Sequence, residues 1–261
     1  MNTGTEGGMR RRACLGLASA VLAAATCLMP HAGNSEPVDR VADAKQRREG
    51  ELRAMFEKGG IRWPAEEVFV RAMKREAQLE LWARNATGEA FRLVKTYPVL
   101  TLSGVPGPKR REGDLQVPEG FYEITRFNPR SSFHLSLGLN YPNASDRVLS
   151  DRKAPGSDIF IHGRVGSIGC LAMGDPAIEE IYLALQASRA RPIQTHFFPA
   201  RMNAPDWPAW RDAELQKRPE LRAFWEQLAV GWECFEREHR LPKIEVGSDG
   251  AYRCKSQGSA K

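Results

Sequence analysis

Residues 159–173 form an apolar run that ends in a glycine-rich turn and a cysteine. The segment reads IFIHGRVGSIGCLAM, which places His162 and Cys170 eight residues apart. The run predicts a short strand, and the glycines after it allow close backbone approach, so successive N–H groups can point at one place beside the sulfur. Because an imidazole beside a thiol favours the thiolate near neutral pH, the segment predicts a cysteine nucleophile with a histidine base.

Two other uses of these side chains compete with catalysis. A free cysteine is usually a small buried hydrophobe, and a single histidine is often a hydrogen-bonded core residue, so both could be structural. The residues His134, His162, His196 and Cys170 could also supply a zinc site. The chain has no His-x-x-x-His or Cys-x-x-Cys spacing, however, and we therefore expect no metal and no other cofactor.

Short β-like runs follow one another from Glu67 onward. Residues 79–82 alternate apolar and polar side chains, and residues 85–89 supply a turn before the chain returns, which predicts a hairpin. Further strands are predicted over residues 121–127, 133–139, 159–162 and 192–198. Several short strands at close spacing predict an α+β domain, mainly β, over residues 65–200, with a sandwich-like or barrel-like core.

Helices are predicted after the cysteine and on both sides of this domain. Asp175 can cap a helix that has Pro176 in its first turn and an apolar face further along. Residues 34–64 read as a linker and helical segment, in which Gly59 and Gly60 close a charged helix. Residues 201–261 predict a helical C-terminal extension and tail.

The first 33 residues predict export. Arg10, Arg11 and Arg12 precede an apolar run over residues 13–29, which is the order of a secretory signal peptide. An uncleaved membrane anchor is the alternative, because the run approaches the minimum length of a span. The formal net charge of +6 is a modest excess without clustered Lys and Arg among aromatic residues, so we expect no nucleic-acid partner.

Export changes what the cysteines can do. Removal of a signal peptide leaves Cys170, Cys234 and Cys254, an odd number in an oxidising compartment. The last two enclose a short loop rich in turn residues, where a disulfide would contribute roughly 3 kcal/mol. We expect that disulfide, and it leaves Cys170 as the free thiol that a nucleophile requires.

Three segments carry a resemblance to a known family. Residues 158–175 resemble a compact form of the His-Gly…Ser-His-Gly-Cys signature of YkuD-type L,D-transpeptidases, and residues 113–122, GDLQVPEGFY, resemble the Thr-Pro-x-Gly-x-Tyr stretch upstream of it. Residues 127–146 are similar to the YafK-like branch. Two positions depart from the common pattern: Ile168 replaces the usual second histidine, and Ala172 replaces an Arg or Asn. These departures put the choice of substrate and acceptor in doubt.

The resemblance implies a site and an activity. It implies Cys170 as nucleophile, His162 as general base, the Gly163 carbonyl as the group that orients the imidazole, and an oxyanion hole from the N–H groups of Gly169 and Cys170. Candidate substrate contacts near the expected mouth are Arg164, His134, Tyr141 and Asn143.

The implied substrates are peptidoglycan stem peptides, in the periplasm. The YafK-like resemblance favours hydrolysis of the bond between diaminopimelate and the terminal Lys of an outer-membrane lipoprotein. Formation of cross-links or protein attachments is one alternative, and a non-catalytic peptidoglycan-binding module is the other.

Overall fold

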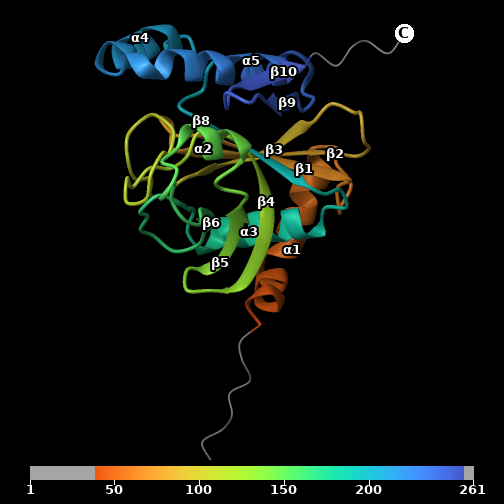
Figure 1. Ribbon diagram of the computed structural model, residues 1–261. Coiled ribbons are helices and arrows are strands. Elements are labelled where there is room, and N and C mark those ends of the chain that lie inside the picture. Colours follow the sequence, from red (N-terminus) through yellow and green to blue (C-terminus); the bar gives the residue numbers. More distant parts are fainter. Residues whose placement is uncertain (1–38, 256–261) are drawn as a thin grey trace, which may run out of the picture. The chain divides into compact units, whose positions relative to one another are not determined.

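The computed structural model describes residues 39–255, which belong to one compact unit (Figure 1). The predicted signal peptide or anchor, the start of the predicted linker and the end of the predicted tail lie outside the described residues. Between residues 39 and 255, no helix is both long enough and apolar enough to cross a membrane.

Eight strands form one mixed sheet in the order β3-β2-β1-β8-β4-β5-β6-β7. They are β1 (Glu67–Met73), β2 (Gln78–Arg84), β3 (Arg92–Pro98), β4 (Gly120–Ser131), β5 (His134–Leu139), β6 (Phe160–His162), β7 (Leu171–Ala172) and β8 (Ile193–Phe198). The pairs β1–β8 and β6–β7 are parallel, and the other neighbours are antiparallel. This sheet with its helices confirms the predicted α+β, mainly β class, and the predicted hairpin is β2–β3.

Strand β1 is buried on both faces because each face meets a different core. Val68, Val70 and Ala72 join the main core, which also contains the apolar face of α3 (Asp175–Ala187). Phe69 points to the other face and packs on Phe235 of α5 (Arg222–Glu238), with ring centroids 5.0 Å apart. The C-terminal extension therefore covers a face of the sheet that would otherwise be exposed to water.

Helix α1 (Arg40–Lys58) is tied to α3 and β5 by charged side chains. Glu179 of α3 accepts hydrogen bonds from Arg47 at 2.6 Å and Arg48 at 3.2 Å, and it lies 2.9 Å from Nε2 of His134. Burial alone would raise the pKa of Glu179, but these hydrogen bonds outweigh it and hold the pKa below its usual value. Arg40 donates to the carbonyl oxygen of His134 at 2.7 Å, so α1 also holds the tip of the β4–β5 hairpin.

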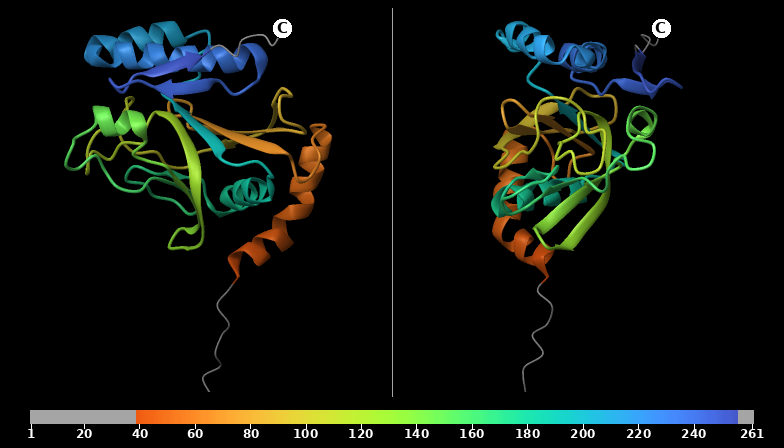
Figure 2. Two further views of the ribbon diagram at one scale, coloured as in Figure 1. Left: turned by 45° about the vertical axis from the view of Figure 1, so that its right-hand side comes forward. Right: turned by 60° about the vertical axis from the view of Figure 1, so that its left-hand side comes forward.

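The C-terminal part differs from the sequence prediction in one respect. The predicted helices are present as α4 (Trp207–Lys217), the short 3-10 helix η1 (Pro219–Leu221) and α5. A hairpin of β9 (Lys243–Val246) and β10 (Tyr252–Lys255) follows them and packs on α5 (Figure 2). Four-residue strands with mostly half-buried side chains carry too weak an alternation to be found in the sequence.

Helix α3 begins as predicted, but Asp175 is not its cap. The N-cap is Gly174, which makes no side-chain hydrogen bond, and Asp175 is the first helical residue. Its Oδ1 accepts the backbone N–H of Arg164 at 2.7 Å instead. The carboxylate therefore fastens the glycine-rich turn to the start of α3.

Candidate active site

The sheet places His162 and Cys170 on the same face. Strands β6 and β7 are parallel with Ile161 opposite Leu171 and His162 opposite Ala172. Continuing that register by one residue sets Cys170 opposite Phe160, and the Phe160 N–H donates to the Cys170 sulfur at 3.4 Å. Because side chains two apart on a strand share a face, Phe160, His162 and Cys170 project to one side.

That side is the floor of a cleft of about 780 Å³. Its walls come from the segment after β3, the tip of the β4–β5 hairpin and the loops on either side of β6. The lining residues are Lys109, Glu112, Gly113, Leu115, Asn128, Ser131, Ser132, Phe133, Ser136, Ser157, Asp158, Ile159, Phe160, His162, Gly166, Ser167, Ile168 and Cys170. Thus the two side chains that the sequence singles out share a cavity large enough for a peptide segment.

His162 is held in one orientation. Its Nδ1 lies 2.7 Å from the carbonyl oxygen of Gly163, so Nδ1 carries the proton and Nε2 is left as the base. The Phe133 ring packs on the imidazole with centroids 4.6 Å apart, and only 3% of His162 is exposed. Burial lowers the pKa of His162, and the bond to Gly163 only partly offsets this effect.

Burial also acts on the pKa of Cys170. Burial raises the pKa of its thiol, while the Phe160 N–H and the charge of Lys109 act in the opposite direction. The two shifts together favour a neutral thiol beside a neutral imidazole near pH 7. Both directions oppose the thiolate that the sequence predicts, because burial of both side chains penalises their charged forms, and the thiolate stays a prediction.

The turn before Cys170 depends on glycine and serine. Gly169 has φ of +129°, and a Cβ there would lie 3.2 Å from the Gln116 carbonyl oxygen. Ser167 donates to the Cys170 carbonyl at 2.5 Å and accepts the Gly169 N–H at 3.2 Å. The Gly169 amide predicted for the oxyanion hole is thus already engaged, which leaves the Cys170 N–H as the candidate donor.

The four predicted substrate contacts do not line the cleft. Asn143 caps α2 (Ala144–Leu149) and donates to the Phe121 carbonyl at 2.9 Å, inside the protein. Tyr141 is buried and donates to the Pro155 carbonyl at 2.7 Å. These two predictions are wrong, because both side chains are used to hold the loops that the sequence placed near the mouth.

The other two predicted contacts, His134 and Arg164, are likewise not among the residues that line the cleft. His134 is paired with Glu179 behind the hairpin tip. Arg164 is exposed, with a positive φ of 56°, on the turn that leaves β6.

Sequence reasoning missed three residues of the cleft, Lys109, Phe133 and Ser136. Lys109 is buried and its Nζ donates to Asp114 at 2.6 Å, which shapes the wall next to Cys170. Ser136 is an ordinary polar position on an alternating strand. Ser136 reaches the site through the pairing of β5 with β6, whereas Lys109 lies in the segment after β3 and Phe133 in the turn between β4 and β5. No local pattern marks any of them.

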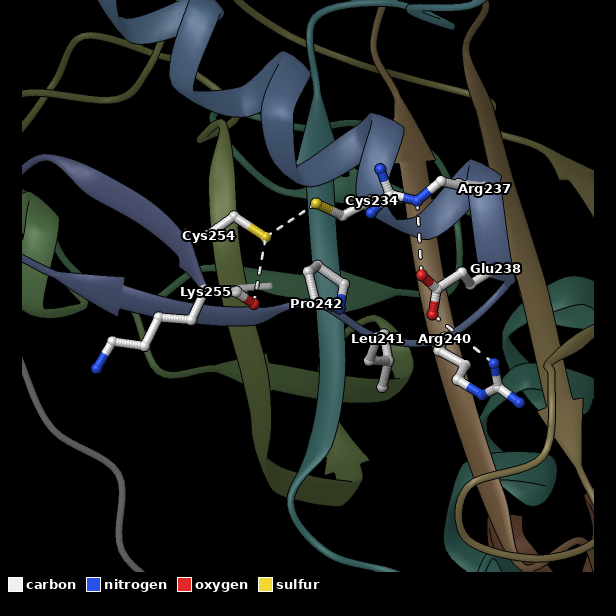
Figure 3. Close-up of a pocket in the computed structure, with 8 residues that line it drawn as sticks. All are labelled: Cys234, Arg237, Glu238, Arg240, Leu241, Pro242, Cys254 and Lys255. Carbon is white, nitrogen blue, oxygen red and sulfur yellow. Dashed lines mark hydrogen bonds and ion pairs between the residues drawn. The ribbon is translucent and has the colours of Figure 1, made fainter. Parts of the chain in front are cut away.

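The predicted disulfide partners lie together, away from the cleft (Figure 3). The sulfur atoms of Cys234 on α5 and Cys254 on β10 are 3.0 Å apart, and both cysteines are free. Burial and the neighbouring Cys234 raise the pKa of Cys254 to about 12. The pair is thus within reach of a bond, and the disulfide stays a prediction.

The four residues considered for zinc do not form one set, because only His162 and Cys170 line the cleft. His196 is buried among Phe69, Phe121 and Phe198, and burial lowers its pKa to about 3. In the part of the chain that the structure describes, no group of three His, Cys, Asp or Glu residues is arranged to hold a metal ion.

Two comparisons with known protein sequences both match L,D-transpeptidases. Residues 69–194 match the model of the L,D-transpeptidase catalytic domain, YkuD. The Escherichia coli K12 protein named "Putative L,D-transpeptidase YafK" is 33% identical over 186 residues, which cover 69% of this chain and 70% of that protein.

Two solved structures also match. The helical cell shape determining protein Pgp2 from Campylobacter jejuni is 17% identical with a TM-score of 0.42, and the match covers 75% of this chain and 80% of that one. Bd1075 from Bdellovibrio bacteriovorus is 19% identical with a TM-score of 0.38, over 67% of this chain and 62% of that one.

Proposed function

Because the chain belongs to the L,D-transpeptidase family with the YkuD catalytic domain, we propose that it is an exported cysteine enzyme that cleaves amide bonds in peptidoglycan stem peptides. The bond we propose joins diaminopimelate to the terminal Lys of a wall-attached lipoprotein. What supports this choice is the resemblance of residues 127–146 to the YafK-like branch, together with 33% identity to the relative YafK over 69% of the chain.

One observation supports the proposal above the others: His162 and Cys170 face one cleft, with the imidazole held by the Gly163 carbonyl. Cys170 attacks the amide carbonyl carbon while His162 Nε2 takes the thiol proton, so the charged sulfur exists only as the carbon–sulfur bond forms. The protonated His162 then delivers that proton to the leaving Lys amine. The product is a thioester on Cys170.

Water completes the reaction. It attacks the thioester carbonyl and loses a proton to His162, and the carbon–sulfur bond breaks as the sulfur regains a proton. The Cys170 N–H is the donor proposed for the oxyanion in both steps. If an amine replaces water, the same intermediate gives cross-links or protein attachments.

The first experiment asks whether the chain is an enzyme at all. Intact-protein mass spectrometry after incubation with a carbapenem is expected to show one adduct on wild type and none on Cys170→Ser. No adduct while Cys170 stays reduced would favour the non-catalytic wall-binding module.

The second experiment distinguishes water from an amine as acceptor. Muropeptides that carry a diaminopimelate–Lys link are incubated with and without an added primary amine. Hydrolysis in both mixtures is expected, whereas product that forms only with the amine would identify a transferase. A Cys170→Ala variant crosslinked to its bound substrate would name the lipoprotein directly.

We also propose that the enzyme acts in the periplasm after removal of a signal peptide within residues 1–33, with the basic and apolar order of that segment as support. Cell fractionation with N-terminal sequencing tests this. Recovery of the uncleaved chain in the inner membrane would identify the anchor instead.

A further inference from the structure

A row of polar side chains crosses the floor of the cleft beside His162. Asn128 of β4 is opposite Ser136 of β5, and Ser136 is opposite His162 of β6. Side chains directly opposite on antiparallel strands share a face, with Cβ atoms about 5 Å apart. All three residues line the cleft, so the row Asn128–Ser136–His162 is part of its surface.

Ser136 is the informative member of this row. It is only 2% exposed, and its hydroxyl is absent from the side-chain hydrogen bonds formed among residues 39–255. The hydroxyl oxygen is not one of the buried side-chain atoms left without a partner, so it is open to water in the cleft. The cleft is where such a partner would sit, since the hydroxyl belongs to a residue that lines it.

Asn128 adds hydrogen-bond donors to the same row. Its Oδ1 accepts the Arg130 N–H at 3.0 Å, which fixes the orientation of the amide. With that oxygen engaged, the Nδ2 group supplies two N–H donors. A hydroxyl and an amide NH₂ together suit a small ligand that carries both a lone pair and protons.

The order of the strands says where this ligand sits. Cys170 precedes β7, on one side of β6, whereas Ser136 and Asn128 lie on β5 and β4, on the other side. His162 therefore stands between the sulfur and the polar row. A general base in this position can take the thiol proton during acylation. It can later take a proton from a second nucleophile on its other side.

We infer that Ser136 and Asn128 form the subsite for the nucleophile that resolves the Cys170 thioester, and that its occupant is the attacking water. The inference rests on the proposed function. The Ser136 hydroxyl accepts a hydrogen bond from one O–H of the water, and that O–H stays on the oxygen. The other proton is transferred to His162 Nε2, and the water oxygen bonds to the thioester carbon as the carbon–sulfur bond breaks. The released thiolate regains the proton from His162.

The test separates formation of the thioester from its breakdown. Ser136→Ala is mixed with a muropeptide donor, and acyl-Cys170 is followed by rapid-quench mass spectrometry. Loss of one neutral hydrogen bond predicts hydrolysis slowed about three- to tenfold, so the thioester accumulates. The carbapenem adduct is expected to form at the wild-type rate, because acylation of Cys170 does not use the water that Ser136 holds.

Two further variants exclude a merely structural effect. Ser136→Thr keeps the hydroxyl and is expected to restore hydrolysis. Thr125→Val removes a β4 hydroxyl that lies outside the cleft and donates to the Gly138 carbonyl, and it is expected to leave the rates of thioester formation and hydrolysis unchanged. Ser136→Gly removes the same hydroxyl and replaces the alanine variant if that one does not fold.

Adding a primary amine identifies the occupant. If hydrolysis alone slows in Ser136→Ala, water occupies the subsite, whereas an equal slowing of aminolysis would overturn the choice of water. Normal breakdown of the thioester in Ser136→Ala would overturn the subsite itself. Absence of any adduct on wild-type Cys170 would overturn the proposed function, and this inference with it.

Discussion

Gly163→Ala is expected to damage both the stability and the chemistry of this protein. An added Cβ would lie 2.7 Å from Asp175 Oδ1, 2.8 Å from the Phe133 carbonyl oxygen and 2.9 Å from Ile178 Cγ2. One of these neighbours is backbone and the other two are held by α3, so none can yield freely. The methyl group must push the start of α3 and the tip of the β4–β5 hairpin apart.

The size of the effect follows from overpacking. Inserting a methyl group into a packed site costs about 1–3 kcal/mol, and each kcal/mol lowers Tm by roughly 2–4 °C in a domain of this size. The Gly163 carbonyl also orients His162, and a misplacement of about 1 Å can slow catalysis roughly 100-fold. We therefore expect carbapenem acylation of Cys170 to slow at least about tenfold.

A second glycine provides a matched control. Gly50 lies within α1, and a Cβ there would meet no atom within 4 Å. Gly50→Ala should raise the free energy of unfolding by about 0.5–1 kcal/mol, because alanine favours the helix, and leave acylation unchanged. Urea unfolding and adduct formation measure both quantities. Wild-type stability and acylation in Gly163→Ala would refute the steric argument.

Four more predictions concern charge and sulfur chemistry. Because burial raises the thiol pKa, the rate at which iodoacetamide alkylates Cys170 should still be climbing above about pH 8.5, and a plateau below that pH would contradict a neutral ground state. The lowered pKa of His162 keeps its base form down to lower pH, so the acidic limb of the activity profile should fall below about pH 6.5 rather than above it. Glu179→Gln should lower the free energy of unfolding by about 1–2 kcal/mol at pH 7. Because the folded-state pKa of Glu179 is lowered, its contribution is present above the unfolded pKa and is lost as pH falls through the folded pKa. A difference in urea unfolding between wild type and variant that does not shrink at acid pH would contradict this reasoning. Mild oxidation should join Cys234 to Cys254 and leave Cys170 titratable, as peptide mapping can show, and a disulfide that includes Cys170 would argue against the pairing.

Most of the secondary structure could be predicted from local patterns. The hairpin β2–β3, the strand before His162 and helix α3 are each encoded in neighbouring residues, through alternation, turn formers and a helical apolar face. The nucleophile candidate Cys170 was also readable, because its glycine-rich turn lies next to it in the chain. Such features depend on interactions within a few residues.

The polar positions were harder to assign. Tyr141 and Asn143 stand near the site in sequence, yet the fold turns both side chains inward to hold loops. Ser136 and Lys109 carry no local signal, yet both line the cleft. A polar side chain can face water, a ligand or a buried partner, and the sequence alone does not tell these apart.

The amino-acid sequence by itself determined the reactive pair, the glycines around it and the class of the fold, because these follow from contacts between close neighbours in the chain. The tertiary structure alone decided which side chains stand beside His162, and in which direction burial shifts the pKa values of His162 and Cys170. Cross-strand register joins Ser136 to His162, and burial sets the pKa values of His162 and Cys170. Both effects exist only once distant segments have packed together.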